Sequence, residues 1–272
     1  MPELPEVETT RLGIQSYLTD QFILAIDIRE PRLRWPADAA IPKLFKNKKI
    51  LAVSRRAKYL LINCEDDLYL IIHLGMSGSI RILENHNAIE KHDHFDIRLS
   101  NQYILRYRDP RRFGALLWCQ GNPETHKLLC DLGPEPLGAD FHFNDFYQKS
   151  RQKRLPIKQY IMDNHIVVGV GNIYANEALF LAGIRPGKAA GRVSRNDFMR
   201  LYKAIIQVLS EAIKQGGTTL KDFRGSNGKP GYFQLELAVY GQNGKDCKIC
   251  GTTIKEKRIG QRNSYYCPKC QS

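Results

Sequence analysis

The chain has 272 residues, enough for two domains and a small additional module. Its 41 Lys and Arg residues outnumber 28 Asp and Glu residues, and the formal charge of +13 predicts an anionic partner, either nucleic acid or an acidic membrane surface. The longest apolar runs are far shorter than the ~20 residues that span a bilayer, and the N-terminus lacks a basic and apolar leader, so we expect a cytoplasmic protein with no membrane partner.

A helix is predicted from Glu6 to Leu18, because apolar residues recur there at helical spacing and Pro5 suits a first helical turn. Between Phe22 and Trp118 the pattern changes to short runs in which apolar residues alternate with other residues. The clearest runs are Leu24-Ile26-Ile28, Leu68-Leu70-Ile72-Leu74, Phe95-Ile97-Leu99 and Tyr103-Leu105-Tyr107. Successive short strands separated by turns predict an antiparallel sandwich or barrel.

Segment 131–138 is rich in Pro and Gly, and helical periodicity follows it, so we expect a domain boundary there and a helical second domain. The clearest helix of that domain is predicted over residues 195–215, with Ser194 as its N-cap, Asp197 at the capping-box position and Gly216 as its stop. Its apolar face is predicted to comprise Leu201, Ile205, Val208 and Ala212.

Four cysteines form two close pairs near the C-terminus, Cys247 with Cys250 and Cys267 with Cys270, and 16 residues separate the pairs. This is the spacing of a tetrahedral four-thiolate zinc site, and the alternative of four unliganded thiols fits so close a spacing poorly. We therefore expect one structural Zn²⁺, because no position is left for a substrate. The residues between the pairs are basic, so the module is expected to present cations to phosphate.

The segment Val168-Gly-Val-Gly-Asn172 resembles a dinucleotide-binding fingerprint only weakly, because the third glycine is absent and no strand precedes it. A glycine turn that opens a helix could instead offer backbone N–H groups to a phosphate, with Asn172 as a further donor. An ordinary turn between helices fits the residues equally well.

Basic residues recur in three further places, and each run alone is more typical of a solvated face than of a binding site. The runs are Arg55, Arg56 and Lys58; Arg106, Arg108, Arg111 and Arg112; and Arg151, Lys153, Arg154 and Lys158. Their presence in both domains and in the cysteine module favours a nucleic-acid groove. Phe113 could wedge between bases, or it could be a core residue of a following strand.

Eight segments together resemble one family. They are PELPEVET (2–9), RRAKYLL (55–61), HLGMSGS (73–79), EKHDH (90–94), DPRRFG (109–114), VGVGNIYANE (168–177), GGTTLKDF (216–223) and the four-cysteine module. In this order they are similar to the formamidopyrimidine-DNA glycosylases, DNA-repair enzymes that remove oxidised purines.

The resemblance implies an α+β fold with three parts. These are an N-terminal antiparallel β-sandwich with flanking helices over residues 1–130, a helix-two-turns-helix domain with a lesion-covering loop over 131–232, and a β-hairpin zinc finger over 233–272. The implied partner is double-stranded DNA that contains an oxidised base, and the implied protein is a monomer that works at the nucleoid of a prokaryote-type cell. The damaged base must be flipped out of the stack, because its anomeric carbon is inaccessible in the duplex.

The resemblance also implies the catalytic residues. Pro2 matches the nucleophile, Glu3 the acid that assists opening of the sugar, and Lys58 a proton donor in β-elimination. Arg262 matches a phosphate ligand that is also assigned to δ-elimination. A secondary amine that attacks the anomeric carbon yields a cationic iminium without further protonation. Pro2 can do so only if Met1 is removed, because the amide nitrogen of Met1-Pro2 is not nucleophilic.

The remaining implied roles concern DNA contacts. Met76, Arg111 and Phe113 match the residues that fill the gap left by the flipped base, and Arg111 matches the reader of the opposite cytosine. Phosphate contacts are implied for His92, Lys153, Lys158 and Asn172.

Two places depart from the family pattern. Gln159 stands where many relatives have proline, and residues 224–227 follow no pattern of the family. The second lies in the Gly-rich segment 216–231, whose length predicts a functional or disordered loop.

We expect a glycosylase with apurinic-site lyase activity on ring-opened purines and 8-oxoguanine. One alternative is the related oxidised-pyrimidine glycosylase, against which the PELPEV start and the DPRRF segment argue. The other is a zinc-containing DNA-binding protein without catalysis, which would have no need of Pro2, Glu3 and Lys58.

Overall fold

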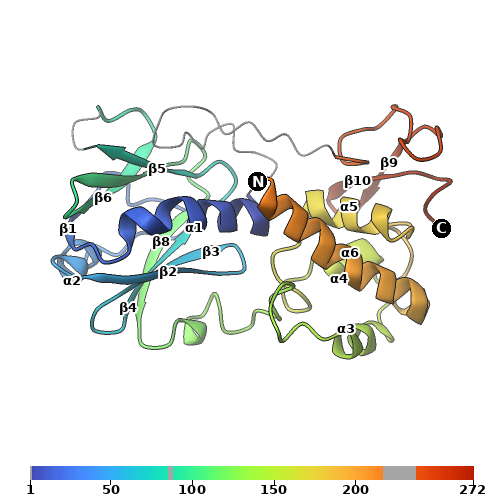
Figure 1. The fold of residues 1–272 in the computed structure, drawn as a ribbon, viewed down its shortest axis with the longest axis horizontal. Coiled ribbons are helices and arrows are strands. Elements are labelled where there is room, and N and C mark those ends of the chain that lie inside the picture. The colour runs from blue at the N-terminus through green and yellow to red at the C-terminus, as the bar shows by residue number, and fades with distance from the viewer. Residues whose placement is uncertain (1, 85–87, 217–236) are drawn as a thin grey trace. The chain divides into compact units, whose positions relative to one another are not determined.

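The computed structural model describes residues 2–84, 88–216 and 237–272, which gather into two compact units (Figure 1). The first unit is built from residues 2–130 and the second from residues 131–215 and 237–272. The predicted three-part division, with its boundary at 232/233, remains a prediction. Residues 224–227 and most of the Gly-rich segment lie outside the described residues. No helix among the described residues is long and apolar enough to cross a membrane.

The first unit is an antiparallel β-sandwich, as predicted. One sheet has the order β1 (Ile23–Ile28), β6 (Asp93–Leu99), β7 (Tyr103–Arg108), β5 (Ser79–Glu84). The other has the order β2 (Ile50–Arg56), β3 (Tyr59–Cys64), β4 (Leu68–His73), β8 (Ala115–Gln120). Alternate apolar residues of the two sheets, for example Ile62 and Leu70 with Ile97 and Leu105, share one buried core, because period-2 patterning places them on one face of each strand.

Helix α1 (Leu4–Leu18) begins two residues before the predicted start and ends where predicted. Pro5 lies in its first turn, where its missing N–H is not required. Ile14 and Leu18 are fully buried, and α1 packs against β2, β3 and β5 (Figure 1). The short helices α2 (Ile41–Phe45) and η1 (Pro123–Thr125) complete this unit.

Strand β1 departs from its predicted pattern at its first residues. Alternation predicts Leu24 and Ile26 on one face, but Ile23 and Ile26 are the buried pair and Leu24 is 47% exposed. The pairing of β1 with β6 shifts register between Ile23 and Ala25. A β-bulge places one extra residue on a strand and so reverses which residues face the core on its two sides.

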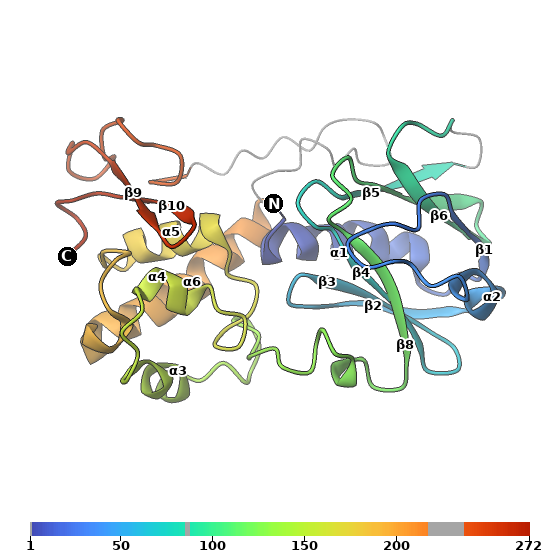
Figure 2. The same ribbon diagram turned by 180° about the vertical axis from the view of Figure 1, so that it is seen from behind.

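Every helix of the second unit lies between residues 143 and 214 of its described part, in agreement with the predicted change of pattern (Figure 2). Its helices are α3 (Phe143–Ser150), α4 (Ile157–Ile161), α5 (Asn172–Leu181), η2 (Ala190–Arg192) and α6 (Arg195–Lys214). Helix α6 ends one residue before the predicted end; the Oγ of Ser194 accepts the N–H of Asp197 at 3.1 Å, and Gly216 has φ +81°. The predicted apolar face of α6 is buried.

The hairpin of β9 (Lys255–Ile259) and β10 (Arg262–Tyr266) lies beside α5 in both views (Figures 1 and 2). The backbone N–H of Tyr265 donates to Asn176 Oδ1 at 2.8 Å, and the side chain of Gln271 donates to the carbonyl of Ile184. These contacts join the hairpin and the chain end to the helices of the same unit.

Candidate functional site

The predicted nucleophile Pro2 precedes a well-ordered helix start. Glu3 is the N-cap of α1 and is 2% exposed, and it forms a capping box with Glu6, whose carboxylate accepts the N–H of Glu3 at 2.8 Å. A capping box satisfies backbone donors that the first helical turn would leave unpaired. Buried contacts therefore fix the backbone next to Pro2, and this segment is not a flexible leader.

The predicted proton donor Lys58 lies in the two-residue turn between β2 and β3, which pair from Arg56 to Tyr59. Arg55 links this turn to α1, because its guanidinium donates to the carbonyl of Ala57 at 2.8 Å and to the carboxylate of Glu8 at 3.0 Å. Burial alone would raise the pKa of Glu8, but Arg11 and Arg55 outweigh it and lower that pKa. The ionised Glu8 thus ties the turn of Lys58 to the helix that carries Pro2 and Glu3.

Two exposed loops carry the residues predicted to fill the gap left by a flipped base. Met76 is 40% exposed in the turn after β4, and Phe113 is 43% exposed in the loop before β8. The guanidinium of Arg111 lies 4.7 Å from the centre of the Phe113 ring. A Cβ on Gly75 would come within 2.4 Å of the Phe113 carbonyl carbon, so the two loops touch backbone to backbone. The structure therefore brings Met76, Arg111 and Phe113 together, and Phe113 is not a core residue.

The turn that ends with His92 adjoins these loops. His92 has φ +76°, and its carbonyl accepts the N–H of Asp109 at 3.0 Å. Its side chain is half-buried. A phosphate contact for His92 stays a prediction.

His73 has an environment that the sequence interpretation missed, although it is the first residue of the HLGMSGS segment. Its Nδ1 accepts the N–H of Gly75 at 3.1 Å, which requires a neutral ring. Burial, followed by the charges of Arg34 and Lys58, lowers the pKa of His73 to about 4. A neutral imidazole therefore supports the turn that carries Met76.

Acid should destabilise the sandwich through His73. The folded-state pKa of His73 is about 4, below the ordinary 6.5. As the pH falls below 6.5, the unfolded chain therefore binds a proton at His73 while the native state does not, which favours unfolding. Between pH 7.5 and pH 5 this should cost roughly 2 kcal/mol of unfolding free energy. His73→Gln should lose that much less stability over the same range in urea titrations. Both tryptophans, Trp35 and Trp118, lie in the first unit, so their fluorescence reports its unfolding; an identical pH dependence in both proteins would contradict this prediction.

In the second unit, the predicted glycine turn opens a helix as expected. Gly169 has φ +81°, Gly171 is the N-cap of α5, and Asn172 is the first residue of that helix. Among the described residues, the element that precedes the turn is helix α4 and not a strand, so the segment does not fit a dinucleotide-binding fingerprint. Within the described part of the chain, Asn172 Oδ1 is buried and has no hydrogen-bond partner. The first-turn N–H groups and Asn172 are compatible with a phosphate contact, which stays a prediction.

The two predicted phosphate-binding lysines of this unit differ in placement. Lys153 is exposed ahead of α4. Lys158 is only 1% exposed, and its ammonium donates to the carbonyl of Asn263 and to Ser264 Oγ, both at 2.8 Å. Lys158 therefore joins α4 to the hairpin, and a phosphate contact for it stays a prediction.

Arg262 is exposed at the start of β10 and lines a hollow of about 240 Å³ together with Lys158 and Gln159. Gln159, which departs from the family pattern, lies against the hairpin turn: a Cβ on Gly260 would come within 2.6 Å of its Nε2. Gly260 has φ +60°, a conformation that favours glycine. Gln159, the residue that departs from the family pattern, therefore contacts the hairpin turn next to Arg262.

The four predicted zinc ligands converge at the base of the hairpin. The Sγ atoms of Cys247 and Cys270 are 3.9 Å apart, those of Cys250 and Cys267 are 3.5 Å apart, and all four lie within 4.8 Å of one another. A tetrahedral zinc with Zn–S bonds of ~2.3 Å requires sulfur–sulfur distances of roughly 3.8 Å, so the thiols fit one Zn²⁺. With all four positions filled by protein, the metal is structural.

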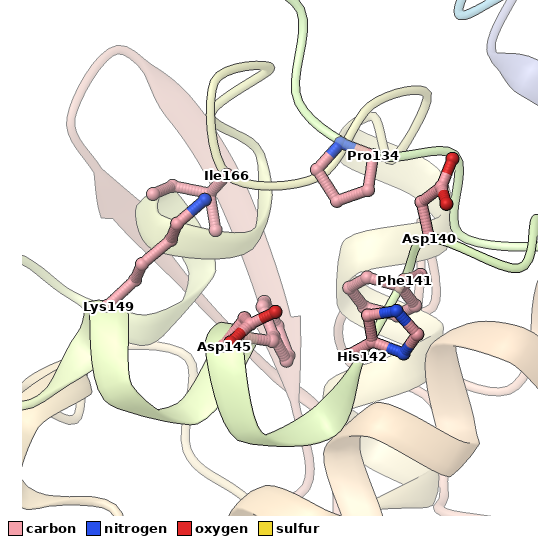
Figure 3. Close-up of a pocket in the computed structure, with 8 residues that line it drawn as sticks. Pro134, Asp140, Phe141, His142, Asp145, Lys149 and Ile166 are labelled. Atoms are coloured by element: carbon pink, nitrogen blue, oxygen red, sulfur yellow. The ribbon is translucent and has the colours of Figure 1, made fainter.

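A separate hollow of about 120 Å³ lies on the helical unit (Figure 3). Asp145 and Lys149 of α3 line one side, with Ile166 and Pro134 opposite. It contains none of the residues that the sequence analysis assigned to catalysis, DNA contacts or metal binding.

Three family models match successive parts of the chain. They are the formamidopyrimidine-DNA glycosylase N-terminal domain over residues 1–116, the formamidopyrimidine-DNA glycosylase H2TH domain over 132–224, and the zinc finger found in FPG and IleRS over 244–272. The formamidopyrimidine-DNA glycosylase of Hahella chejuensis is 54% identical over 271 residues, which covers 100% of both chains.

Two solved structures of the Lactococcus lactis enzyme are similar to this chain. Its complex with DNA containing Fapy-dG gives a TM-score of 0.90 at 36% identity and covers 99% of this chain and 100% of that one. Its complex with DNA containing an abasic site gives a TM-score of 0.91 at 35% identity and covers 99% of each chain.

Proposed function

The chain belongs to the formamidopyrimidine-DNA glycosylase family, and from this membership we propose that it excises oxidised purines from duplex DNA and then cleaves the strand. The substrates are ring-opened formamidopyrimidines and 8-oxoguanine. The observation that carries the catalytic part is the helix start at Pro2: Glu3 and Glu6 are buried around it, and Glu8 and Arg55 tie it to the turn of Lys58. A passive DNA-binding protein would have no use for this arrangement.

The proposed chemistry starts with the free imino nitrogen of Pro2. That nitrogen forms a bond to the anomeric carbon of the flipped nucleotide while the bond to the base breaks, and the departing base takes the proton that the nitrogen releases. Glu3 donates a proton to the ring oxygen of the sugar, which opens to an iminium. The positive iminium acidifies the neighbouring C2′ proton, so its removal expels the 3′-phosphate in β-elimination.

Lys58 and Arg262 act in the later steps. Lys58 acts as a proton donor during β-elimination, which suits a half-buried cation in a turn fixed to α1. Arg262 binds a phosphate from the zinc hairpin and assists δ-elimination. Water finally hydrolyses the iminium and restores the free imino nitrogen of Pro2.

The remaining cationic and amide residues hold the DNA. Phosphate contacts are assigned to His92, Lys153, Lys158 and Asn172, and the zinc hairpin presents its own cations to the backbone. We propose that the protein acts as a monomer on nucleoid DNA in the cytoplasm.

Borohydride trapping tests the proposed function, because it reduces an iminium to a stable amine. We expect the protein to be trapped on duplex DNA that carries 8-oxoguanine opposite cytosine, with the adduct on Pro2. Trapping on oxidised pyrimidines but not on 8-oxoguanine would assign the chain to the related pyrimidine enzymes. Tight binding without any trapping would assign it to passive DNA-binding proteins.

Arg111→Ala should weaken discrimination for the base opposite the lesion. A well-placed arginine contact to a base contributes ~1 to 3 kcal/mol of selectivity, or roughly 5- to 150-fold in relative rate. Single-turnover excision of 8-oxoguanine opposite cytosine and opposite adenine measures this ratio. Arg98→Ala is a suitable control, because Arg98 lies on β6 and pairs with Asp27 at 3.0 Å. A preference for cytosine that survives Arg111→Ala would remove Arg111 from this role.

A further inference from the structure

Asp109 is a fully buried carboxylate directly after β7, and its exposed fraction is 0%. It accepts four hydrogen bonds from two loops and a strand. They come from Ser77 Oγ at 2.5 Å and Arg111 N at 3.2 Å to Oδ1, and from Gly114 N at 2.9 Å and Tyr107 Oη at 3.1 Å to Oδ2. Burial, and then the charge of Asp109, raise the pKa of Tyr107, so its phenol keeps the proton that it donates.

These partners flank Met76, Arg111 and Phe113, which we call the wedge residues. Ser77 follows Met76 in one loop, and the N–H groups of Arg111 and Gly114 lie on either side of Phe113 in the other. The N–H of Arg111 is also 3.2 Å from Ser77 Oγ, so the two loops and the carboxylate form one hydrogen-bonded group. One side chain therefore makes hydrogen bonds to both loops.

The backbone of Asp109 extends this group to the turn of His92. Its N–H donates to the carbonyl of His92 at 3.0 Å, and its carbonyl oxygen is 2.6 Å from Nε2 of His94. Since a carbonyl can only accept, the ring of His94 must donate from Nε2. All four residues of the first unit that the sequence predicts to contact DNA thus belong to loops joined at Asp109.

The side chains at the tips of the two loops reach the surface. Met76 and Phe113 are substantially exposed, and among the described residues neither belongs to the buried core cluster of the first unit. Beneath them the packing is tight: a Cβ on Gly114 would lie only 1.7 Å from the side-chain Oη of Tyr107, and one on Gly75 would overlap the Phe113 backbone. A shift of the carboxylate or its partners must therefore move both loops.

We propose that Asp109 is a positioning residue for base recognition: its carboxylate sets the relative placement of Met76, Arg111 and Phe113, and hence their entry into the duplex and the reading of the opposite base. It acts through these residues and touches no DNA. The inference rests on the proposed function. It requires a carboxylate, because an amide of the same shape has a single acceptor oxygen and turns an NH₂ group toward the donors on its other side.

The test compares Asp109→Asn with Asp27→Asn, a matched control on β1 whose carboxylate is half-exposed. Excision of 8-oxoguanine opposite cytosine and opposite adenine is measured under single-turnover conditions. Borohydride trapping on a single-stranded abasic oligonucleotide is measured alongside, because that substrate has no opposite base and no stack to enter. 2-Aminopurine beside the lesion reports entry of the wedge residues by a change of fluorescence.

For Asp109→Asn we expect duplex excision opposite cytosine to fall roughly 10- to 100-fold, since displacement of positioning groups by about 1 Å has effects of this size. The preference for cytosine and the 2-aminopurine signal should fall with it, while trapping on the single strand is retained. Asp27→Asn should behave as wild type in every assay.

Several outcomes would overturn the proposal. Unchanged duplex excision and cytosine preference in folded Asp109→Asn would remove the role, and an equal loss on duplex and single strand would reduce Asp109 to a general support of the fold. If Asp109→Asn does not fold, Ser77→Ala decides, because it removes one donor and leaves three; it should lower the cytosine preference in the same direction, and an unchanged preference would refute the inference. Wild-type protein that is inactive on 8-oxoguanine would instead refute the proposed function.

Discussion

Protein that retains Met1 should bind lesion-containing DNA yet give no borohydride-trapped adduct. With Met1 attached, the nitrogen of Pro2 is a tertiary amide whose lone pair is delocalised into the carbonyl, so it can neither attack the sugar nor form an iminium. The contacts that shape the helix start, between Glu3 and Glu6, involve residues after Pro2. The expected effect is therefore a complete loss of chemistry in a folded protein.

The experiment uses two preparations of the same chain, one processed and one in which removal of the initiator is blocked, and each is verified by intact mass. DNA affinity is measured on a duplex with a non-reactive abasic analogue, and trapping on 8-oxoguanine opposite cytosine. An extra residue beside Pro2 can crowd the site and weaken binding, so the trapping result decides. An adduct on a wholly Met1-retained chain, mapped to a lysine, would disprove the Pro2 mechanism.

Cys267→Ser should abolish zinc binding and release the hairpin. Cys267 is fully buried, and its Sγ lies among the other three thiols and 3.4 Å from the N–H of Cys270. A serine hydroxyl is a poor zinc ligand at neutral pH, and metal binding contributes ~10 to 16 kcal/mol in zinc-finger peptides, far more than so small a hairpin gains by packing. Arg262 lies on β10 within this module, so DNA affinity should fall at least about 10-fold with the loss of its phosphate contacts.

Zinc content by mass spectrometry and DNA affinity at a fixed salt concentration check this prediction. Cys119→Ser is the matched control, because Cys119 is half-buried in β8 and belongs to no cysteine cluster within the described residues. Tryptophan fluorescence should show a folded sandwich in both variants, since the cysteine module belongs to the other unit. Full zinc occupancy in Cys267→Ser would exclude the four-cysteine site.

Features with short-range causes could be predicted from the sequence. The caps of α6 depend on Ser194 and Gly216, which act on backbone groups within four residues. The zinc site depends on two Cys-x-x-Cys turns, whose spacing alone brings each pair of thiols together. Alternation within single strands likewise indicated an antiparallel sandwich or barrel before the strand pairing was known.

Features that depend on distant partners could not be predicted. The bulge in β1 is a property of its pairing with β6, which lies about 70 residues away, so local alternation placed Leu24 wrongly. Lys158 looks like any other cation in a basic run, and only the approach of the hairpin gives its ammonium two buried acceptors. Resemblance pointed to Lys158 as a phosphate ligand, but it could not indicate these contacts.

The sequence by itself indicated an antiparallel sandwich or barrel, the helical second half and the zinc ligands, because each follows from residue type and spacing within a few turns of chain. The resemblance to the family chose the sandwich and implied the role of Pro2. Only the tertiary structure decided how the functional residues are held. Ser77 and Asp109 are 32 residues apart and Glu8 and Arg55 are 47 apart, yet each pair makes a hydrogen bond. A buried carboxylate is stable only where folding supplies donors for its oxygens, and the sequence does not state which distant donors those are.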